Sequence, residues 1–233
     1  SFHFGLPSAG LLARVKSWGS KVLSSATTVD EARWLEAHGV DAVIAQGVEA
    51  GGHRGIFLGD DLTTQVGTLA LVPQVVRAVR VPVIAAGGIA DAKGVAAAIA
   101  LGAAGAQVGT AYMLCPEATT TRIHRTALAS DAARHTALTN LFTGRPARGI
   151  VNRVIRELGP MILEAGGDRE CSRTVRIVGS PAEVPQRVGP VDRLVESRLG
   201  LTILLVTDCG RDGDGFRPCS RGGVVPEREV LGV

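Results

Sequence analysis

Hydrophobic and polar positions follow a repeating pattern over the first 110 residues. Short runs rich in Val, Ile and Ala predict strands, and longer stretches with apolar residues every three or four positions predict helices. The strand runs are apolar almost throughout, which is typical of parallel strands buried on both faces. Successive strands begin ~20–24 residues apart, except that the interval between the third and the fourth is twice as long. Strands are expected at residues 1–5, 21–25, 41–45, 81–85 and 105–109.

Local signals set the ends of the expected helices. Thr28 and Glu31 have the spacing of a capping box, and Gly39 stops the helix that they begin. Asp91 is the expected N-cap of a later helix. Pro73 is expected in the first turn of another, where proline is tolerated. Helices are expected at residues 11–18, 29–38, 70–79 and 92–101.

The pattern changes after residue 109. Residues 119–133 and 152–158 are predicted to be helical, and 141–153 to form a turn-rich basic loop. The repeat of strands and helices indicates an α/β fold with a parallel sheet. A doubly wound sheet and a (β/α)₈ barrel both fit this pattern, which does not choose between them.

Composition divides the chain into two parts. Of the 233 residues, 45% are hydrophobic and 3% aromatic, so the core must rely on Ala, Val, Leu and Ile. From about residue 161 the chain has one aromatic residue, no Lys and three of the four cysteines. We therefore expect a folded part at 1–160 and a divergent tail at 161–233, whose Gly- and Arg-rich end favours disorder. The apolar run 199–206 is a candidate isolated strand.

Charge and cysteine usage exclude several classes of function. The net charge is +3, and the arginines are scattered with few aromatic residues among them, so we expect no nucleic-acid interface. No apolar run reaches the ~18 residues of a membrane span, and the N-terminus does not resemble a signal peptide. No two cysteines form a C-x-x-C pair, which disfavours structural zinc and fits a reduced, cytoplasmic setting. The sequence carries no signal for the oligomeric state.

Glycines follow three of the expected strands, in residues 46–55, 86–89 and 107–110. Ligands of parallel α/β folds bind at the C-terminal ends of strands, where glycine lets backbone N–H groups approach them. With the helix N-terminus at Ala92, these loops form a candidate phosphate cradle. The alternative is that the glycines only make tight turns.

His53 is the candidate catalytic residue, because it lies between glycines on the longest loop. An imidazole with a pKa near ~6.5 can act as a base at neutral pH. Glu49 is a candidate acid or base, although a helix-capping or surface role is favoured, and Cys115 is expected to be buried in packing. The remaining histidines are expected to be structural; they are His3, His38, His124 and His135.

Five segments together resemble the bacterial nitronate monooxygenases, formerly called 2-nitropropane dioxygenases. They are FHFG at 2–5, EAGGHRG at 49–55, PVIAAGGI at 82–89, GAQVGT at 105–110, and FTGRPARG at 142–149 followed by Asn152 and Arg153. The resemblance covers about residues 1–160. It implies the C-terminal half of a (β/α)₈ TIM barrel, preceded in family members by roughly another half barrel that supplies further flavin contacts.

The resemblance also implies a cofactor, a reaction and site residues. The cofactor is non-covalent FMN, and His53 matches the catalytic histidine. Flavin contacts are implied for Gln46 and Gly51, and phosphate contacts for Gly88, Gln107, Val108, Gly109 and Thr110. The implied reaction oxidises an alkyl nitronate with O₂ to a carbonyl compound and nitrite, and no metal site is expected.

Two alternatives remain open from the sequence. The FMN-dependent enoyl-acyl-carrier-protein reductases share the Gly-Gly-His and Ala-Ala-Gly-Gly-Ile motifs, whereas Arg54 and residues 142–148 favour the monooxygenase. The other alternative is an inactive truncated product, because five strands of an eight-stranded barrel leave open edges.

Overall fold

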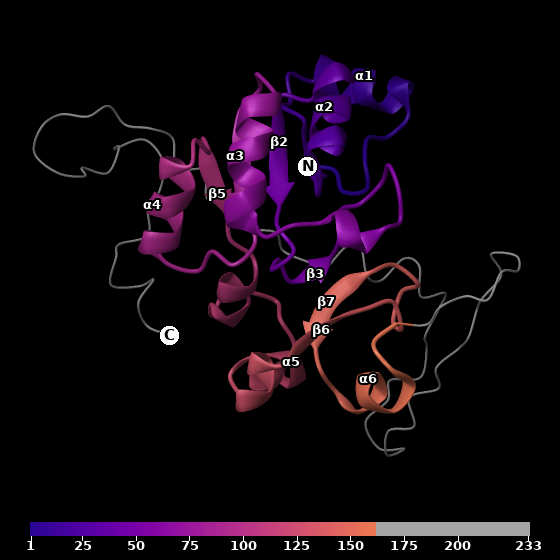
Figure 1. The fold of residues 1–233 in the computed structure, drawn as a ribbon, viewed down its shortest axis with the longest axis vertical. Helices are drawn as coiled ribbons and strands as arrows, with labels where there is room; N and C mark the ends of the chain where they lie inside the picture. The colour runs from indigo at the N-terminus through magenta and orange to yellow at the C-terminus, as the bar shows by residue number, and fades with distance from the viewer. Residues whose placement is uncertain (162–233) are drawn as a thin grey trace, which may run out of the picture.

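A four-stranded parallel sheet forms the centre of the computed structural model, which describes residues 1–161 (Figure 1). Its strands lie side by side in chain order: β1 (Leu23–Ala26), β2 (Ala42–Gln46), β4 (Val83–Ala86) and β5 (Gly105–Gln107). Doubly wound sheets reverse their strand order at a switch point, whereas barrel strands follow the chain. The predicted parallel α/β fold is confirmed, and the order is that of a barrel section.

Helices cover one face of this sheet. They are α1 (Ala9–Ser17), α2 (Val29–Ala37), α3 (Thr68–Ala78) and α4 (Ala92–Ala100). The strand residues that share a buried cluster with the helices are Ala26, Val43, Ala45, Val83 and Ala85. Because side chains alternate along a strand, their neighbours Ala42, Ile44, Ile84 and Ala86 form a second, smaller cluster on the opposite face. None of the helices within residues 1–161 is long and apolar enough to cross a membrane.

A second, antiparallel sheet of three strands has the order β3-β7-β6. Its strands are β3 (Gly52–His53), β6 (Thr136–Thr139) and β7 (Ala147–Ile150). In Figure 1 the arrow of β2 points toward β3, so the small sheet lies at the C-terminal end of the parallel strands. The remaining elements are η1 (Leu62–Thr64), η2 (Thr110–Leu114), α5 (Arg122–Leu128), η3 (Asp131–Arg134) and α6 (Arg153–Leu158).

Several predicted boundaries were wrong for identifiable reasons. The expected first strand is reduced to one parallel bridge, Phe2 to Ser24, because the chain turns away through positive φ angles at Phe4 and Gly5. The helix expected at 70–79 begins at Thr68, so Pro73 lies beyond its first turn. Residues 119–133 divide into α5 and η3, and the basic loop contains β7. The tail and its candidate strand lie outside the described residues.

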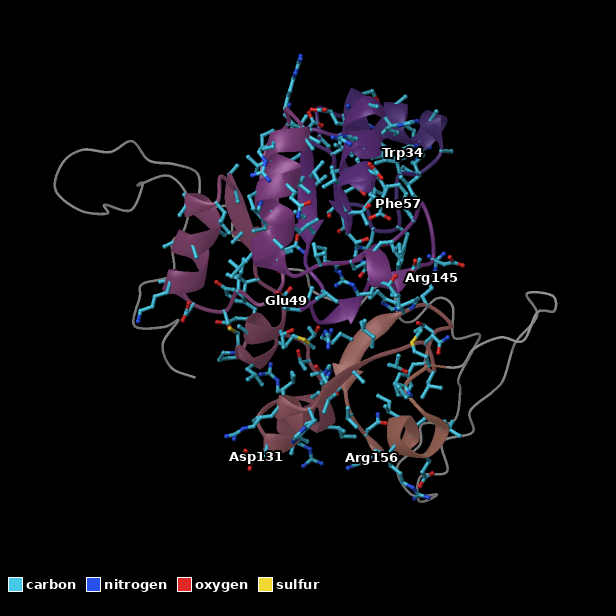
Figure 2. The ribbon with its side chains drawn as sticks, in the orientation of Figure 1. Trp34, Glu49, Phe57, Asp131, Arg145 and Arg156 are labelled. Atoms are coloured by element: carbon cyan, nitrogen blue, oxygen red, sulfur yellow. The ribbon has the colours of Figure 1, made fainter. Side chains whose placement is uncertain are left out.

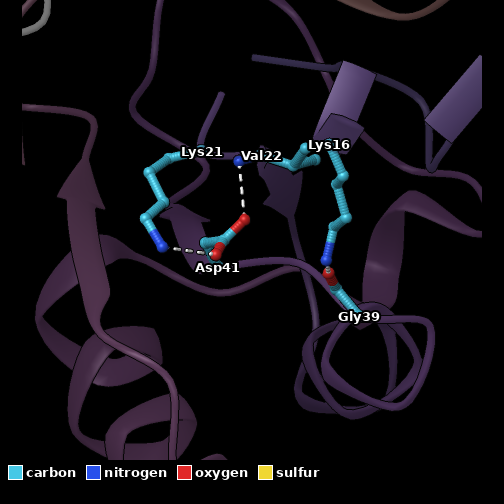
Figure 3. Close-up of polar contacts among 5 residues, drawn as sticks. All are labelled: Lys16, Lys21, Val22, Gly39 and Asp41. Carbon is cyan, nitrogen blue, oxygen red and sulfur yellow. Dashed lines mark hydrogen bonds and ion pairs between the residues drawn. The ribbon is translucent and has the colours of Figure 1, made fainter. Parts of the chain in front are cut away.

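The N-terminal end of the sheet is fixed by charged groups (Figure 3). The Val22 amide donates to Asp41 Oδ2 at 2.8 Å, and Lys21 Nζ lies 3.2 Å from Asp41 Oδ1. These contacts, the backbone hydrogen bond first, hold the pKa of Asp41 below its usual value. Lys16 donates to the Gly39 carbonyl, which closes the C-terminus of α2. These contacts tie β1, α1 and α2 together at the end of the sheet remote from β3.

The buried carboxylate of Glu31 fixes the loop that follows β3. The Thr28 hydroxyl accepts from the Glu31 amide, as the capping box predicted. The Glu31 side chain does not return to Thr28, however. One carboxylate oxygen accepts from the amide and hydroxyl of Thr27 at 2.6 and 2.7 Å, and the other from the Phe57 amide at 2.6 Å. Figure 2 shows Phe57 beside Trp34 of α2, with ring centroids 5.2 Å apart.

Replacing Glu31 by Gln should lower the free energy of unfolding by about 2 kcal/mol, measured by urea denaturation. An amide presents N–H groups to at least one pair of donors that the carboxylate accepts, and leaves them unpaired in the core. The matched control is Asp30→Asn, one position earlier on the same helix, where the carboxylate is exposed and forms an ion pair with Arg33. An equal, small loss for both variants would contradict this role of Glu31.

Candidate active site

Two glutamine side chains lie on one face of the parallel sheet at its C-terminal edge. The register pairs Gln46 of β2 with Ala86 of β4, and Ala86 with Gln107 of β5. Residues in register on parallel strands point to the same face of the sheet. Both amides therefore lie on the face that carries Ile44, opposite the face covered by the helices. Gln107 Oε1 is buried and has no hydrogen-bond partner among residues 1–161. Buried polar atoms are normally paired, so this oxygen marks a place for a polar ligand.

The predicted glycines lie around the row formed by Gln46, Ala86 and Gln107 at this edge of the sheet. A Cβ on Gly51 would lie 2.8 Å from Thr110 Oγ1, so the loops after β2 and β5 touch. Gly88 has a φ of 68°, which only glycine adopts readily, and it is exposed. Nothing lies within 4 Å of a Cβ built on Gly109, so its backbone is open to a ligand. The side chain of Val108 is buried, so only its backbone could take part.

One part of the predicted cradle is already capped by a side chain. The N-terminus of α4 was expected to help hold a phosphate, but the Asp91 carboxylate accepts from the Gly94 amide there at 2.7 Å. That carboxylate already accepts from one of the amides at the start of α4, and it places a negative charge beside the helix end. An anion at this edge would therefore rely on the loops at Gly88 and Gly109 rather than on the helix.

The side chain of Gln46 anchors the histidine loop. Its Oε1 accepts from the Gly55 amide at 2.8 Å, and its Nε2 donates to the His53 carbonyl at 3.0 Å. The backbone carbonyl of Gln46 accepts from Arg54 Nη2 at 2.9 Å. One Nε2 hydrogen remains for a further acceptor. Gln46 is thus a structural clamp as well as a candidate flavin contact.

His53 is held from three sides. Its backbone pairs with Ala147 of β7, and its Nε2 lies 2.9 Å from Thr143 Oγ1. The His53 carbonyl also accepts from His3 Nε2 at 3.2 Å, and the His53 ring meets the Phe4 ring edge-on at 5.8 Å. Removal from solvent, and then the charge of Arg145, lower the pKa of His53 below 6.5. The imidazole is therefore neutral at pH 7 and able to accept a proton.

Arg54 is fully buried beneath this loop. Its Nε donates to Gln65 Oε1 at 2.7 Å, while Nη1 has no partner in the described part of the chain. Burial, followed by the nearby Arg148, lowers the Arg54 pKa to about 10. Gln65 donates in turn to Thr27, which contacts the Glu31 carboxylate. A continuous polar chain thus runs from the histidine loop to α2.

The structure settles the roles of Glu49 and Cys115. The Glu49 carboxylate accepts from the amide of Thr68 at 2.9 Å and from its hydroxyl at 3.0 Å, and so caps α3 (Figure 2 labels Glu49). The capping alternative was therefore correct. Cys115 was expected to be buried, but it is half-buried, and it is free. Residues 1–161 contain no group of side chains that could hold a metal ion.

Sequence reasoning missed the part of the site contributed by residues 142–149 and by His3. The segment was expected to be a turn-rich basic loop and none of its residues was expected in the site, yet Thr143 contacts His53 and Arg145 stacks over Phe4 at 4.3 Å. Arg148 donates to the Val48 carbonyl at 3.0 Å. His3 was expected to be structural, which its hydrogen bond to the His53 carbonyl bears out, but its place beside His53 was not predicted. The sequence did contain one indication, because FHFG and FTGRPARG are two of the five segments that resemble the family.

Comparison with known proteins decides the family. The sequence model of the nitronate monooxygenase family matches residues 1–179. The chain belongs to the nitronate monooxygenase family. It is 51% identical over 152 residues to a nitronate monooxygenase of Paraburkholderia phytofirmans, covering 65% of this chain and 42% of that protein. It is 48% identical over 154 residues to one of Pseudomonas aeruginosa, covering 66% and 44%. The chain thus spans less than half the length of these relatives.

Two solved structures have a similar fold. Nitroalkane oxidase from Streptomyces ansochromogenes superposes with a TM-score of 0.64 at 48% identity, over 68% of this chain and 46% of that one. FabK from Thermotoga maritima superposes with a TM-score of 0.56 at 37% identity, over 66% and 47%. Members of the nitronate monooxygenase family are enzymes of the oxidoreductase class, and the predicted resemblance is confirmed.

The lowered pKa values of His3 and His53 predict a pH dependence of stability. For His3, too, burial is the largest cause. Between the folded pKa and the unfolded value of 6.5, the unfolded chain binds more protons than the folded one. Stability is therefore highest above pH ~6.5 and falls as the pH drops through the folded pKa. Histidine NMR titration should give midpoints below 6.5 for both rings, and midpoints above 6.5 would contradict this description of the site.

Proposed function

We propose that this chain carries the catalytic histidine and half of the flavin site of an enzyme that oxidises alkyl nitronates with O₂. The products would be a carbonyl compound and nitrite. The proposal rests on one arrangement: a neutral His53, clamped by Gln46, beside an open row of amide and glycine groups at the sheet edge. Family membership supports oxidation of nitronates as the reaction class.

The residues at this edge fit FMN. Gln107 Oε1 is a buried acceptor without a partner among the described residues, and Gln46 Nε2 keeps one hydrogen for a ring acceptor. Backbone groups at Gly88 and Gly109 are open to a phosphate, and the Thr110 hydroxyl lies beside Gly51. Bound FMN would supply the redox chemistry of the reaction. The candidate contacts are Gln46, Gly51, Gly88, Gln107, Val108, Gly109 and Thr110.

His53 would act on the carbon next to the nitrogen of the substrate. Its Nε2 is engaged by Thr143, and no hydrogen bond to Nδ1 occurs among residues 1–161, so Nδ1 is the nitrogen available to substrate. From a neutral nitroalkane, the imidazole would take the proton on that carbon, and positive neighbours would stabilise the nitronate formed. A nitronate from solution would instead be positioned by hydrogen bonds.

A second candidate activity is enoyl-thioester reduction, favoured by the similarity to FabK at 37% identity. Its distinguishing property is oxidation of NADH or NADPH in the presence of an enoyl thioester. The contact of Thr143 with His53 favours the monooxygenase, because Thr143 belongs to the segment on which that resemblance rests.

The test is nitrite release by the full chain supplied with FMN, measured with 2-nitropropane, whose proton must be removed, and with propane-2-nitronate, which has already lost it. With 2-nitropropane we expect His53→Gln to lower kcat/KM at least about 100-fold, because the glutamine amide can reach toward Thr143 but cannot serve as a base. With propane-2-nitronate the loss should be smaller, because no proton is taken. His124→Gln, on the exposed surface of α5, is the control and should match the wild type. If His53→Gln releases nitrite from 2-nitropropane as fast as the wild-type chain, His53 is not the catalytic base.

A further inference from the structure

Phe4 has an unusual backbone conformation next to His53. It is the one non-glycine residue with positive φ, 64°, in the part of the chain that the structure describes. This conformation is costly for a bulky side chain, and such residues are found where the surroundings hold them for a purpose. The Phe4 ring lies edge-on to both His3 and His53, at 4.6 and 5.8 Å. The strain thus places an aromatic face beside the candidate base.

The guanidinium of Arg145 covers that aromatic face. Its Cζ lies 4.3 Å from the centre of the Phe4 ring, a cation–π distance. Stacking occupies one face of the guanidinium and leaves the N–H groups at its edge for an acceptor. No carboxylate within residues 1–161 forms an ion pair with Arg145; the four ion pairs there involve other residues. Figure 2 shows Arg145 at the turn between the two long strands of the small sheet.

The charges around His53 are predominantly positive. Arg54 and Arg148 lie nearby; Glu49 and Glu31 act on Arg54, and no carboxylate is among the groups that shift the pKa of His3 or His53. Both carboxylates already accept backbone hydrogen bonds, Glu49 from the start of α3 and Glu31 from the loop after β3. The charge of Arg145 depresses the pKa of both His3 and His53, so its field reaches both imidazoles. An anion at His53 would therefore meet mainly positive charge from residues 1–161.

We propose that Arg145, stacked on Phe4, is a specificity-determining residue that makes the site prefer an anionic nitronate over the neutral nitroalkane. This inference rests on the proposed function. A nitronate spreads one negative charge over two oxygens, which a planar guanidinium can bind through two parallel hydrogen bonds. A nitroalkane has the same two oxygens but no net charge. The difference in binding between the two forms therefore measures the contribution of the positive charge.

Binding to the full chain, with FMN added, tests the preference without requiring turnover. Propane-2-nitronate and 2-nitropropane are titrated separately while the His53 ring signals are followed by NMR. We expect Arg145→Gln to weaken nitronate binding about fivefold at low ionic strength, and less in high salt, because the side chain is exposed. Binding of 2-nitropropane should not change. Arg145→Lys keeps the charge and should retain most of the affinity for the nitronate.

Arg156→Gln is the matched control, since Arg156 is an exposed arginine on α6 whose loss changes the net charge equally (Figure 2). The proposal is overturned if Arg145→Gln binds the nitronate as tightly as the wild type, if it weakens both ligands equally, or if the wild type shows no nitronate-dependent shift. Nitrite release is measured on the same samples. Charge-selective binding without nitrite would reject the proposed function and leave the role of Arg145 intact.

Discussion

The candidate site depends on the side-chain amide of Gln46. This residue ends β2, the strand between β1 and β4, and its amide donates to the His53 carbonyl and accepts from the Gly55 amide. Without it, the buried Gly55 amide would lose its partner, at a cost of about 1–3 kcal/mol, and the His53 carbonyl would keep the contact with His3 but lose the one with Gln46. The position of the imidazole is thereby fixed by the strand that also carries the face for a ligand.

The rest of the polar network extends this anchoring away from the site. Arg54 joins the backbone of Gln46 to Gln65, and Thr27 connects Gln65 to Glu31 on α2. The small antiparallel sheet closes the loop from the other side through Ala147 and Thr143. His53 is therefore placed by Gln46 of the parallel sheet and by Thr143, which lies 90 residues further along the chain. Its ring is left partly open, beside an aromatic face and a cation without a carboxylate partner in the described chain.

Local signals predicted the repeating strands and helices, the capping roles of Thr28 and Asp91, and the loop that carries His53. These features depend on neighbours within a few residues, which a single sequence shows directly. The contact between His53 and Thr143 joins positions 90 residues apart, so no local pattern contains it. The positive φ of Phe4 is likewise imposed by its tertiary neighbours. Strand order, which decided between the barrel section and the doubly wound sheet, also required the structure.

The central claim is that this sheet edge, as formed by the present chain, holds a flavin next to His53. The most direct measurement is the visible absorption spectrum of the purified chain after incubation with FMN and desalting, with circular dichroism recorded on the same sample. The account predicts a retained flavin with a shifted spectrum, and loss of that flavin in Gln107→Leu, which removes the buried acceptor. A folded wild-type chain that releases all of its FMN into the small-molecule fraction would contradict it.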